Sequence, residues 1–197
     1  MTPLPTTTWP LLKKGQIDEA ISQYQKVIRL KPDDVSAHHH LGLAFEKRGQ
    51  LDDAISQYQE AARLKPDDAV MHYDLGNALF NKGQIDAAIS QYQQATRLKP
   101  DYADAYNNLG AALGNKGQLD AAIKQYQQAI RLKPLLALAR NNLGVVLSKK
   151  GQLDEAISQY QEAVRLEPDY TDAKNNLASA LELKAKSKVQ PPVPVRP

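Results

Sequence analysis

The stretch Ala103–Pro134, ADAYNNLGAALGNKGQLDAAIKQYQQAIRLKP, is repeated along the chain with small changes. Sliding the sequence by 34 residues superposes three sets of identical residues. These are Gly15, Gly49, Gly83, Gly117 and Gly151, then Tyr24, Tyr58, Tyr92, Tyr126 and Tyr160, and finally Pro32, Pro66, Pro100, Pro134 and Pro168. A fixed period of this size is typical of stacked supersecondary units, each of which buries its apolar face against its neighbours.

Each unit has the apolar spacing of two helices. In the quoted stretch, apolar residues recur every three or four positions, first over residues 109–113 and then over 119–130, which predicts two amphipathic helices. Gly117 lies between them and can adopt the left-handed conformation that ends a helix. Pro134 cannot continue the second helix. Gly110 has no side chain, so we expect the two helices to approach closely there and a bulkier residue to overpack the crossing.

Eight positions of the stretch carry a resemblance to a known family. They are Tyr106, Leu109, Gly110, Leu113, Ala122, Tyr126, Ala129 and Pro134. This set resembles the signature of the tetratricopeptide repeat, and it recurs over roughly residues 16 to 184. The resemblance implies an all-α, right-handed superhelix of about five helix-turn-helix repeats with a C-terminal capping helix. The departures from the family pattern are His38, His72, Arg140 and Lys174, where the family often has an aromatic residue, and Val27, where it has alanine.

The resemblance also predicts the domain boundaries. The solenoid is expected over residues 16–170, as the second helix of a first repeat followed by four full repeats, 35–68, 69–102, 103–136 and 137–170. Residues 1–15 are expected to be an irregular, proline-containing segment in place of a first helix, because proline disrupts helices. Residues 171–186 are expected to form the capping helix, and residues 187–197 a proline-rich, disordered tail.

The first repeat raises the possibility of an exposed edge. Without a complete first helix, we expect Ile17, Ile21, Tyr24 and Ile28 to lie on an uncovered flank, which Trp9, Leu11 and Leu12 would cover only in part. Such a flank would be either an assembly surface or a sign that the chain is part of something longer.

Composition and charge exclude several function classes. The chain has no cysteine, which excludes disulfides, thiolate metal sites and cysteine nucleophiles. Four of its cations and no acid lie in residues 184–197, so the rest of the chain is close to neutral despite the net charge of +3. The remaining cations gather at helix ends, where they complement the helix dipole. We therefore expect no nucleic-acid partner and, since no apolar run approaches a span, no membrane partner, with a cytoplasmic location.

Neither a catalytic nor a metal site is expected. Three successive histidines, His38-His39-His40, point about 100° apart on a helix and cannot converge on one ion. Polar residues recur in rows rather than converging in a cluster, and Gly114 is the only glycine outside the repeat pattern, so there is no phosphate loop. We expect no enzyme activity and no cofactor.

One junction between repeats departs from the pattern. Elsewhere the link is Pro-Asp-Asp or Pro-Asp-Tyr, in which aspartate can cap the next helix. The link at Pro134 is followed by Leu135, Leu136 and Leu138. These leucines either pack on the adjacent second helix or form an exposed apolar spot.

The resemblance implies a concave groove lined by first helices. Mapped onto this chain, its fifth and sixth positions and one ninth position give the candidate peptide-binding residues. They are His39, Tyr73, Asn107 and Asn141 (fifth), His40, Asp74, Asn108, Asn142 and Asn176 (sixth), and Asn77 (ninth). An asparagine amide can pair with both the C=O and the N–H of a peptide unit, so a row of them predicts sequence-tolerant binding. The alternative is that the row is only a polar, solubilising helix face.

Three functions remain open at this point. The first is a scaffold that binds an extended peptide or a partner helix. The second is a self-assembling protein that binds another copy of itself through its N-terminal edge. The third is the recognition segment of a larger enzyme. The family's clamp for a C-terminal carboxylate is not expected, because Tyr73, Leu138 and Asn142 stand where that clamp has cations.

Overall fold

The computed structural model describes residues 14–189, and it is helical throughout apart from the turns. The helices of this part are α1 (Lys14–Leu30), α2 (Val35–Arg48), α3 (Leu51–Leu64), α4 (Ala69–Asn81), α5 (Ile85–Leu98), α6 (Ala103–Asn115), α7 (Leu119–Leu132), α8 (Ala137–Lys149), α9 (Leu153–Leu166) and α10 (Thr171–Val189). The predicted all-α class is confirmed. The capping helix α10 runs three residues beyond its expected end at Lys186. Residues 187–189 of the expected tail are therefore helical. The rest of that tail, residues 190–197, and the covering residues Trp9, Leu11 and Leu12 lie outside the described part.

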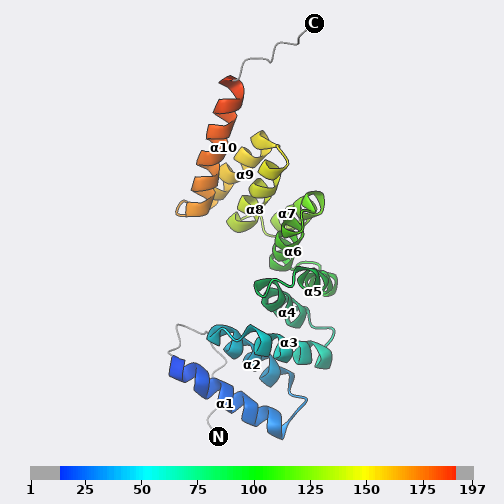
Figure 1. Cartoon of the computed structure of the whole chain (residues 1–197). Helices are drawn as coiled ribbons and strands as arrows, with labels where there is room; N and C mark the ends of the chain where they lie inside the picture. Colours follow the sequence, from blue (N-terminus) through cyan, green and yellow to red (C-terminus); the bar gives the residue numbers. More distant parts are fainter. Residues whose placement is uncertain (1–13, 190–197) are drawn as a thin grey trace. The chain divides into compact units, whose positions relative to one another are not determined.

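The chain divides into two compact units, residues 1–84 and 85–197. Unit 1 contains α1 to α4 and unit 2 contains α5 to α10, and within each unit every helix packs against the next one (Figure 1). In unit 2 the first helices of successive repeats also touch, α6 with α8 and α8 with α10. Stacked first helices are the requirement for a shared, ligand-facing surface.

Glycine controls both the turn and the crossing of each hairpin. Gly117 ends α6 with a φ of +75°, a left-handed conformation that most residues avoid. At the crossing, a Cβ on Gly110 would lie 2.9 Å from Cε1 of Tyr126. The close approach predicted at Gly110 is therefore confirmed, and what lies over the glycine is the tyrosine ring of the second helix.

The aspartate caps form at only some of the junctions. Asp34 accepts a hydrogen bond from the Ala37 N–H at 3.0 Å, and Asp68 accepts one from the Val70 N–H at 3.0 Å. At the Pro-Asp-Tyr junction before α6 the cap residue is Tyr102, which makes no side-chain cap bond. The prediction that aspartate caps this junction is wrong, because the helix begins one residue later than Asp101 would require.

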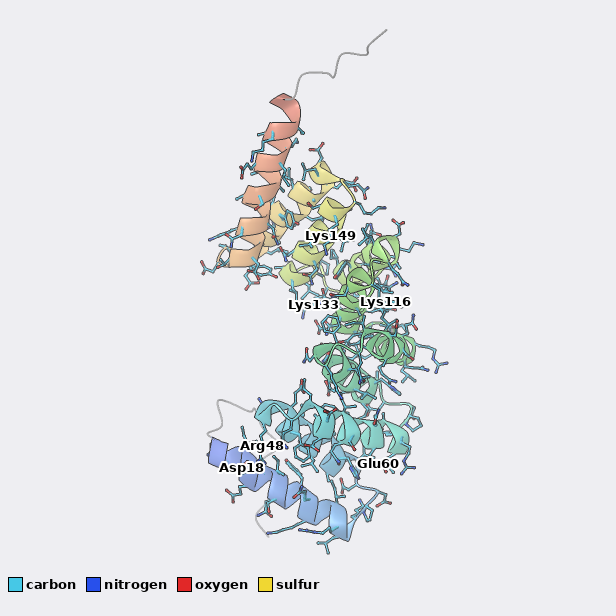
Figure 2. All side chains as sticks on the ribbon, in the orientation of Figure 1. Asp18, Arg48, Glu60, Lys116, Lys133 and Lys149 are labelled. Carbon is cyan, nitrogen blue, oxygen red and sulfur yellow. The ribbon has the colours of Figure 1, made fainter. Side chains whose placement is uncertain are left out.

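Ion pairs link successive repeats on the surface. An aspartate near the start of a second helix pairs with the cation 30 residues further along the chain, which lies on or just after the next first helix. In unit 2 the pairs are Asp86–Lys116, Asp120–Lys150 and Asp154–Lys184, and in unit 1 they are Asp52–Lys82 and Asp18–Arg48. Both members of the Asp18–Arg48 pair are labelled in Figure 2. These cations complement helix ends as expected, and they also join neighbouring hairpins.

Of the four residues predicted on an exposed edge of α1, Ile28 is half-buried and the other three are buried. Ile17, Ile21 and Tyr24 are each less than one tenth exposed. Helix α1 packs against α2, and the Tyr24 ring stacks on His40 with the ring centroids 5.4 Å apart. The prediction of an uncovered flank at these residues is wrong, because it counted only the missing partner within the first repeat.

The leucines of the Pro134 junction are largely exposed. Leu135 is 75% exposed and Leu138 is 44% exposed, whereas Leu136 is partly covered. Of the two alternatives, the exposed apolar spot describes Leu135 and Leu138.

Candidate functional site

The asparagines of the two predicted rows differ in exposure. The fifth-position residues Asn107 and Asn141 are only 4% and 5% exposed. The sixth-position residues Asn108, Asn142 and Asn176 are half-buried. Neighbouring residues of a helix point about 100° apart, so one row faces the adjacent helices while the next faces outward. The sixth row is therefore the more accessible part of the candidate site.

Hydrogen bonds connect the two rows from one repeat to the next. Asn142 Nδ2 donates to Asn107 Oδ1 at 3.2 Å, and Asn176 Nδ2 donates to Asn141 Oδ1 at 2.9 Å. Asn107 Nδ2 in turn donates to Asn108 Oδ1 at 3.0 Å. Each amide offers two donors and an oxygen with two lone pairs, so these bonds leave further capacity on Asn142 and Asn176. The buried row thus positions the accessible row.

In unit 1 the corresponding contact, from the fifth position of one repeat to the sixth position of the next, joins different side chains. His39 Nε2 lies 2.7 Å from Asp74 Oδ2, with both side chains mostly buried. His40 is occupied by its stack on Tyr24 and by a 2.7 Å contact between its Nδ1 and the Ser36 carbonyl oxygen. Tyr73 and Asn77 both lie half-buried on α4. Unit 1 therefore brings His39 and Asp74 together in place of the amide pairs of unit 2.

Three of the four residues that replace the family aromatic, all except Lys174, have a common structural role. His38 Nε2, His72 Nε2 and Arg140 Nη2 contact the carbonyl oxygens of Pro32, Pro66 and Pro134 at 2.9, 3.0 and 3.1 Å. His38 is 6% exposed and also contacts Gln57 Oε1 at 2.8 Å. These side chains bind the turn that precedes their own helix, which places them outside the ligand-facing rows.

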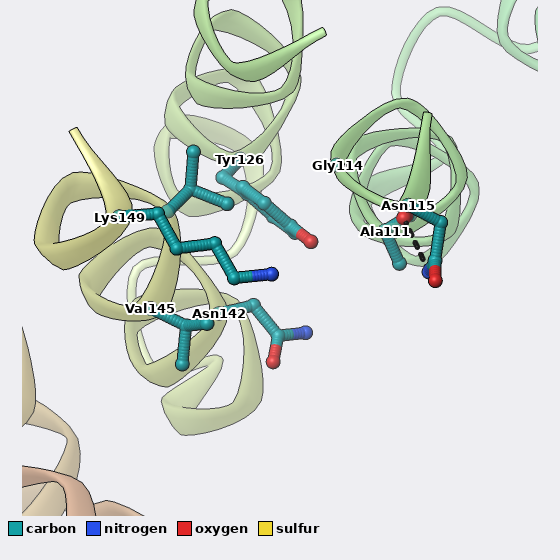
Figure 3. A pocket seen from close by; sticks show the side chains of 8 residues that line it. Ala111, Gly114, Asn115, Tyr126, Asn142, Val145 and Lys149 are labelled. Carbon is teal, nitrogen blue, oxygen red and sulfur yellow. Dashed lines mark hydrogen bonds between the residues drawn. The ribbon is translucent and has the colours of Figure 1, made fainter. Parts of the chain in front are cut away.

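A cavity of about 200 Å³ lies in unit 2 against α6, α7 and α8 (Figure 3). It is lined by Ala111, Gly114, Asn115, Tyr126, Asn142, Val145, Val146 and Lys149. Asn142 is the one predicted site residue among them. Asn115 Nδ2 donates to the Ala111 carbonyl at 3.0 Å on the α6 side of the cavity. The cavity therefore opens beside the accessible asparagine row.

Tyr126 and Lys149 line the cavity, but they are not among the site residues that the sequence predicts. Tyr126 belongs to the repeat signature and was assigned to the core, where it is indeed only 3% exposed. Lys149 was assigned to the end of a helix. The sequence feature that could have indicated the cavity is Gly114, the one glycine outside the repeat pattern.

Burial raises the pKa of the hairpin tyrosines Tyr58 and Tyr126. It raises the pKa of the Tyr126 hydroxyl well above its usual range, and burial together with the Glu46 carboxylate does the same to the pKa of Tyr58. Both hydroxyls are therefore protonated at neutral pH and able to donate a hydrogen bond.

Metal-ion sites and membrane-spanning helices are two other features that the described residues can be checked for. Within the described side chains, residues 15–187, no three histidine, aspartate or glutamate side chains are grouped so that they could hold a metal ion. None of the helices described between residues 14 and 189 combines the length and apolar character needed to cross a membrane.

Comparison with known proteins places the chain in a family. The family model of the TPR repeat matches five stretches, residues 11–49, 47–83, 76–117, 115–151 and 146–184. The chain belongs to the tetratricopeptide repeat family. Four of the five stretches end at glycines that superpose at the 34-residue period, Gly49, Gly83, Gly117 and Gly151. A search of curated protein sequences found no match.

Solved structures share the fold over most of the chain. A crystal structure of MamA is 32% identical, with a TM-score of 0.73, over 88% of this chain and 93% of MamA. The crystal structure of YrrB is 24% identical, with a TM-score of 0.72, over 88% of this chain and 84% of YrrB. The first TPR of Spaghetti (RPAP3) is 24% identical, with a TM-score of 0.59, over 60% of this chain and 94% of that domain. At 24% identity the last two show a common fold alone.

Proposed function

We propose that this tetratricopeptide repeat protein is a protein-interaction scaffold that holds an extended peptide segment of a partner protein along the first helices of unit 2, with no chemical step. The observation that carries the proposal is the accessible row Asn108, Asn142 and Asn176, which recurs once per repeat. Asn142 and Asn176 each donate a hydrogen bond to a buried asparagine, Asn107 and Asn141, and these bonds hold them in place. Fixed amides lose less conformational freedom on binding than mobile ones, which favours affinity.

The chemistry of the row suits a peptide backbone. An amide can donate to a peptide C=O and accept from a peptide N–H, so it does not depend on the side chains of the ligand. Equivalent residues of successive repeats present this chemistry at regular intervals, which suits a long ligand better than a small molecule.

Two neighbours with the same fold support peptide binding. YrrB is described as a TPR protein with an unusual peptide-binding site, and the Spaghetti domain was solved bound to the HSP90 peptide SRMEEVD. Self-assembly through the N-terminal edge has less support than peptide binding, because three of the four residues predicted on that edge, Ile17, Ile21 and Tyr24, are buried.

A panel of short synthetic peptides tests the proposal. The peptides are acetylated and amidated, so they lack terminal charges, and binding is measured by fluorescence anisotropy. The double variant Asn108→Ala with Asn142→Ala should weaken binding about tenfold or more, because it removes two hydrogen-bonding groups. The matched control is Gln127→Ala with Gln161→Ala, which removes two exposed amides from α7 and α9. Equal loss in the two double variants, or no binding by the wild type, would contradict the proposal.

A further inference from the structure

Unit 1 contains a carboxylate held inside its own hairpin. The Tyr58 hydroxyl donates to Glu46 Oε2 at 2.9 Å. Asn81 Nδ2 lies 3.5 Å from the other oxygen, Glu46 Oε1. Glu46 is the twelfth residue of its repeat, Tyr58 lies on the second helix of the same hairpin, and Asn81 belongs to the next first helix. Three elements therefore define a position that a carboxylate occupies.

The same position in unit 2 lacks the carboxylate. Two repeats further on, Tyr58 corresponds to Tyr126 and Asn81 to Lys149, but Glu46 corresponds to Gly114. All three of these residues line the 200 Å³ cavity. Figure 3 shows the Tyr126 hydroxyl and the Lys149 ammonium pointing into the same space. The groups that would hold a carboxylate are thus present, and the residue that would supply it is absent.

Both polar groups are without a partner in the part of the chain that the structure describes. Tyr126 is 3% exposed, yet its hydroxyl makes no hydrogen bond to another described residue. Lys149 makes no ion pair with any side chain of residues 15–187, whereas its neighbour Lys150 pairs with Asp120. The Tyr126 hydroxyl faces the cavity, where water reaches it, so a carboxylate in the cavity would accept its hydrogen bond in place of water.

Neither the backbone nor the packing explains the glycine at position 114. Gly114 lies inside α6 and does not have a positive φ. A Cβ there would lie 3.7 Å from Val146 Cγ2 and 3.9 Å from the Ala122 Cβ, both ordinary contacts. Glycine in a helix is less stable than alanine. What distinguishes position 114 is that it lines the same cavity as Tyr126 and Lys149.

The cavity is suited to a single acidic side chain. Its lining contains a lysine, a protonated phenol, two amides and several apolar residues, but no carboxylate. A volume of about 200 Å³ is below the roughly 300 Å³ at which small-molecule sites begin. Hydrogen bonds from charged donors to a carboxylate are among the strong ones.

We infer that this cavity receives an aspartate or glutamate side chain of the bound peptide, whose carboxylate takes the place that Glu46 fills in unit 1. The inference rests on the proposed function. The accessible row continues on α6 and α10, to either side of α8, so the peptide main chain passes the cavity and a side chain enters it. The next hairpin does not repeat the site, because Ser148 corresponds to Gly114 and Leu183 corresponds to Lys149.

The test uses the capped peptide panel, with glutamate or glutamine placed at each position in turn. Because the capped peptides have no terminal carboxylate, any preference for acid belongs to a side chain. Wild-type protein should prefer glutamate over glutamine about tenfold or more at one position. Lys149→Met and Tyr126→Phe should each reduce this ratio while leaving the glutamine peptide bound. Lys124→Met removes an exposed lysine of α7 that does not line the cavity, and it should keep the ratio.

Refilling the cavity is the second arm. Gly114→Glu places a carboxylate where Glu46 stands in unit 1, so it should abolish the glutamate preference and raise the melting temperature. Gly114→Ala should raise the melting temperature and keep the preference, which separates helix stability from occupation of the cavity.

The outcomes separate the inference from the proposed function. Peptide binding with no preference for an acid, or a preference that survives both Lys149→Met and Gly114→Glu, would overturn the inference and leave the scaffold proposal intact. Absence of any peptide binding by the wild type would overturn both. An acid preference seen only with free C-terminal carboxylates would also overturn the inference, because it would assign the site to a chain end.

Discussion

At the scale of single residues, the two asparagine rows have separate tasks. Asn107 is 4% exposed and is hydrogen-bonded to Asn142 and Asn108, so it acts inside the structure. Asn142 lies at the cavity and keeps unused hydrogen-bonding groups. A row of identical residue types therefore contains both a structural and a ligand-facing set.

Substitution of the buried asparagine should cost stability. Asn107→Ala leaves the Asn142 amide without its acceptor, so the free energy of unfolding should fall by about 1–3 kcal/mol. Urea unfolding followed by circular dichroism measures the change. Gln127→Ala, an exposed amide on α7, is the control and should stay within about 0.5 kcal/mol of the wild type. Equal stability of the two variants would show that the buried amide is not structural.

The helix cap at Asp34 should make stability depend on pH. The N–H of Ala37 donates to this carboxylate and lowers its pKa below the usual range. A lowered pKa in the folded state stabilises the protein above the unfolded-state value of about 3.9, and this contribution is lost as the pH falls through the folded-state pKa. Asp34→Ala should therefore cost about 1 kcal/mol at neutral pH and progressively less below about pH 4.

Thermal unfolding at a series of pH values checks the cap. Asp33→Ala changes the neighbouring exposed aspartate and should show no such pH-dependent difference. A loss in Asp34→Ala that stays constant down to the lowest pH would contradict the role of the charged carboxylate.

At the scale of elements, the contact between α6 and α7 distinguishes two glycines of one helix. A Cβ at position 110 would lie 2.9 Å from Tyr126 Cε1, whereas one at position 114 would lie no closer than 3.7 Å to Val146 Cγ2. Gly110→Ala should destabilise the protein by about 1–3 kcal/mol through overpacking. Gly114→Ala should instead stabilise it by up to about 1 kcal/mol through helix propensity.

The free energies of unfolding of Gly110→Ala and Gly114→Ala are measured in parallel by urea unfolding, and each variant serves as the control for the other. The free energy of unfolding should change in opposite directions in the two variants. If both variants are stabilised, the close contact at position 110 relaxes without cost; if both are destabilised, the space at position 114 is needed for folding.

The ion pairs between hairpins should contribute only a small, salt-dependent stabilisation. Lys150 pairs with Asp120 and lowers the pKa of that carboxyl, but Asp120 is highly exposed to solvent. Asp120→Asn should lower the melting temperature slightly at low ionic strength, and the difference should vanish in about 1 M salt, where the screening length is about 3 Å. Scanning calorimetry at the two salt concentrations measures the difference in melting temperature between Asp120→Asn and the wild type. A difference that persists in high salt would indicate that Asp120 stabilises the protein by something other than its charge.

At the scale of the whole molecule, a linear stack is least stable at its ends. Within the described residues of unit 2, α10 is the last helix, and Leu181 and Leu183 on it are 46% and 54% exposed. Helix α8, by contrast, touches α6, α7, α9 and α10. Stability in such arrays is approximately a sum over repeats and their interfaces.

Hydrogen exchange should reveal this gradient. Amides in the second half of α10 should exchange faster than amides of α8, because fewer buried contacts must be lost to open them. Exchange detected by mass spectrometry of peptides from the two helices gives the comparison. Uniform protection across both helices would mean that unit 2 unfolds as one cooperative body.

Much of this architecture could be predicted from the sequence, because it depends on local rules that repeat. The 34-residue period, the helix pairs and the left-handed turn at Gly117 follow from residue spacing, propensity and glycine conformation. Repetition strengthened each of these predictions, since a pattern seen once in a short segment is ambiguous but the same pattern in every repeat is not. The close approach at Gly110 followed in the same way.

Only the tertiary structure decided how the repeats use their variable residues. The burial of Asn107, the covered face of Ile21 and the exposure of Leu135 depend on which helix packs over each of them, and spacing within one repeat does not contain that information. The same holds for the cavity, because its lining comes from three helices, with the Tyr126 hydroxyl and the Lys149 ammonium brought together by stacking. Local physics thus determined the repeat, while contacts between repeats determined its accessible chemistry.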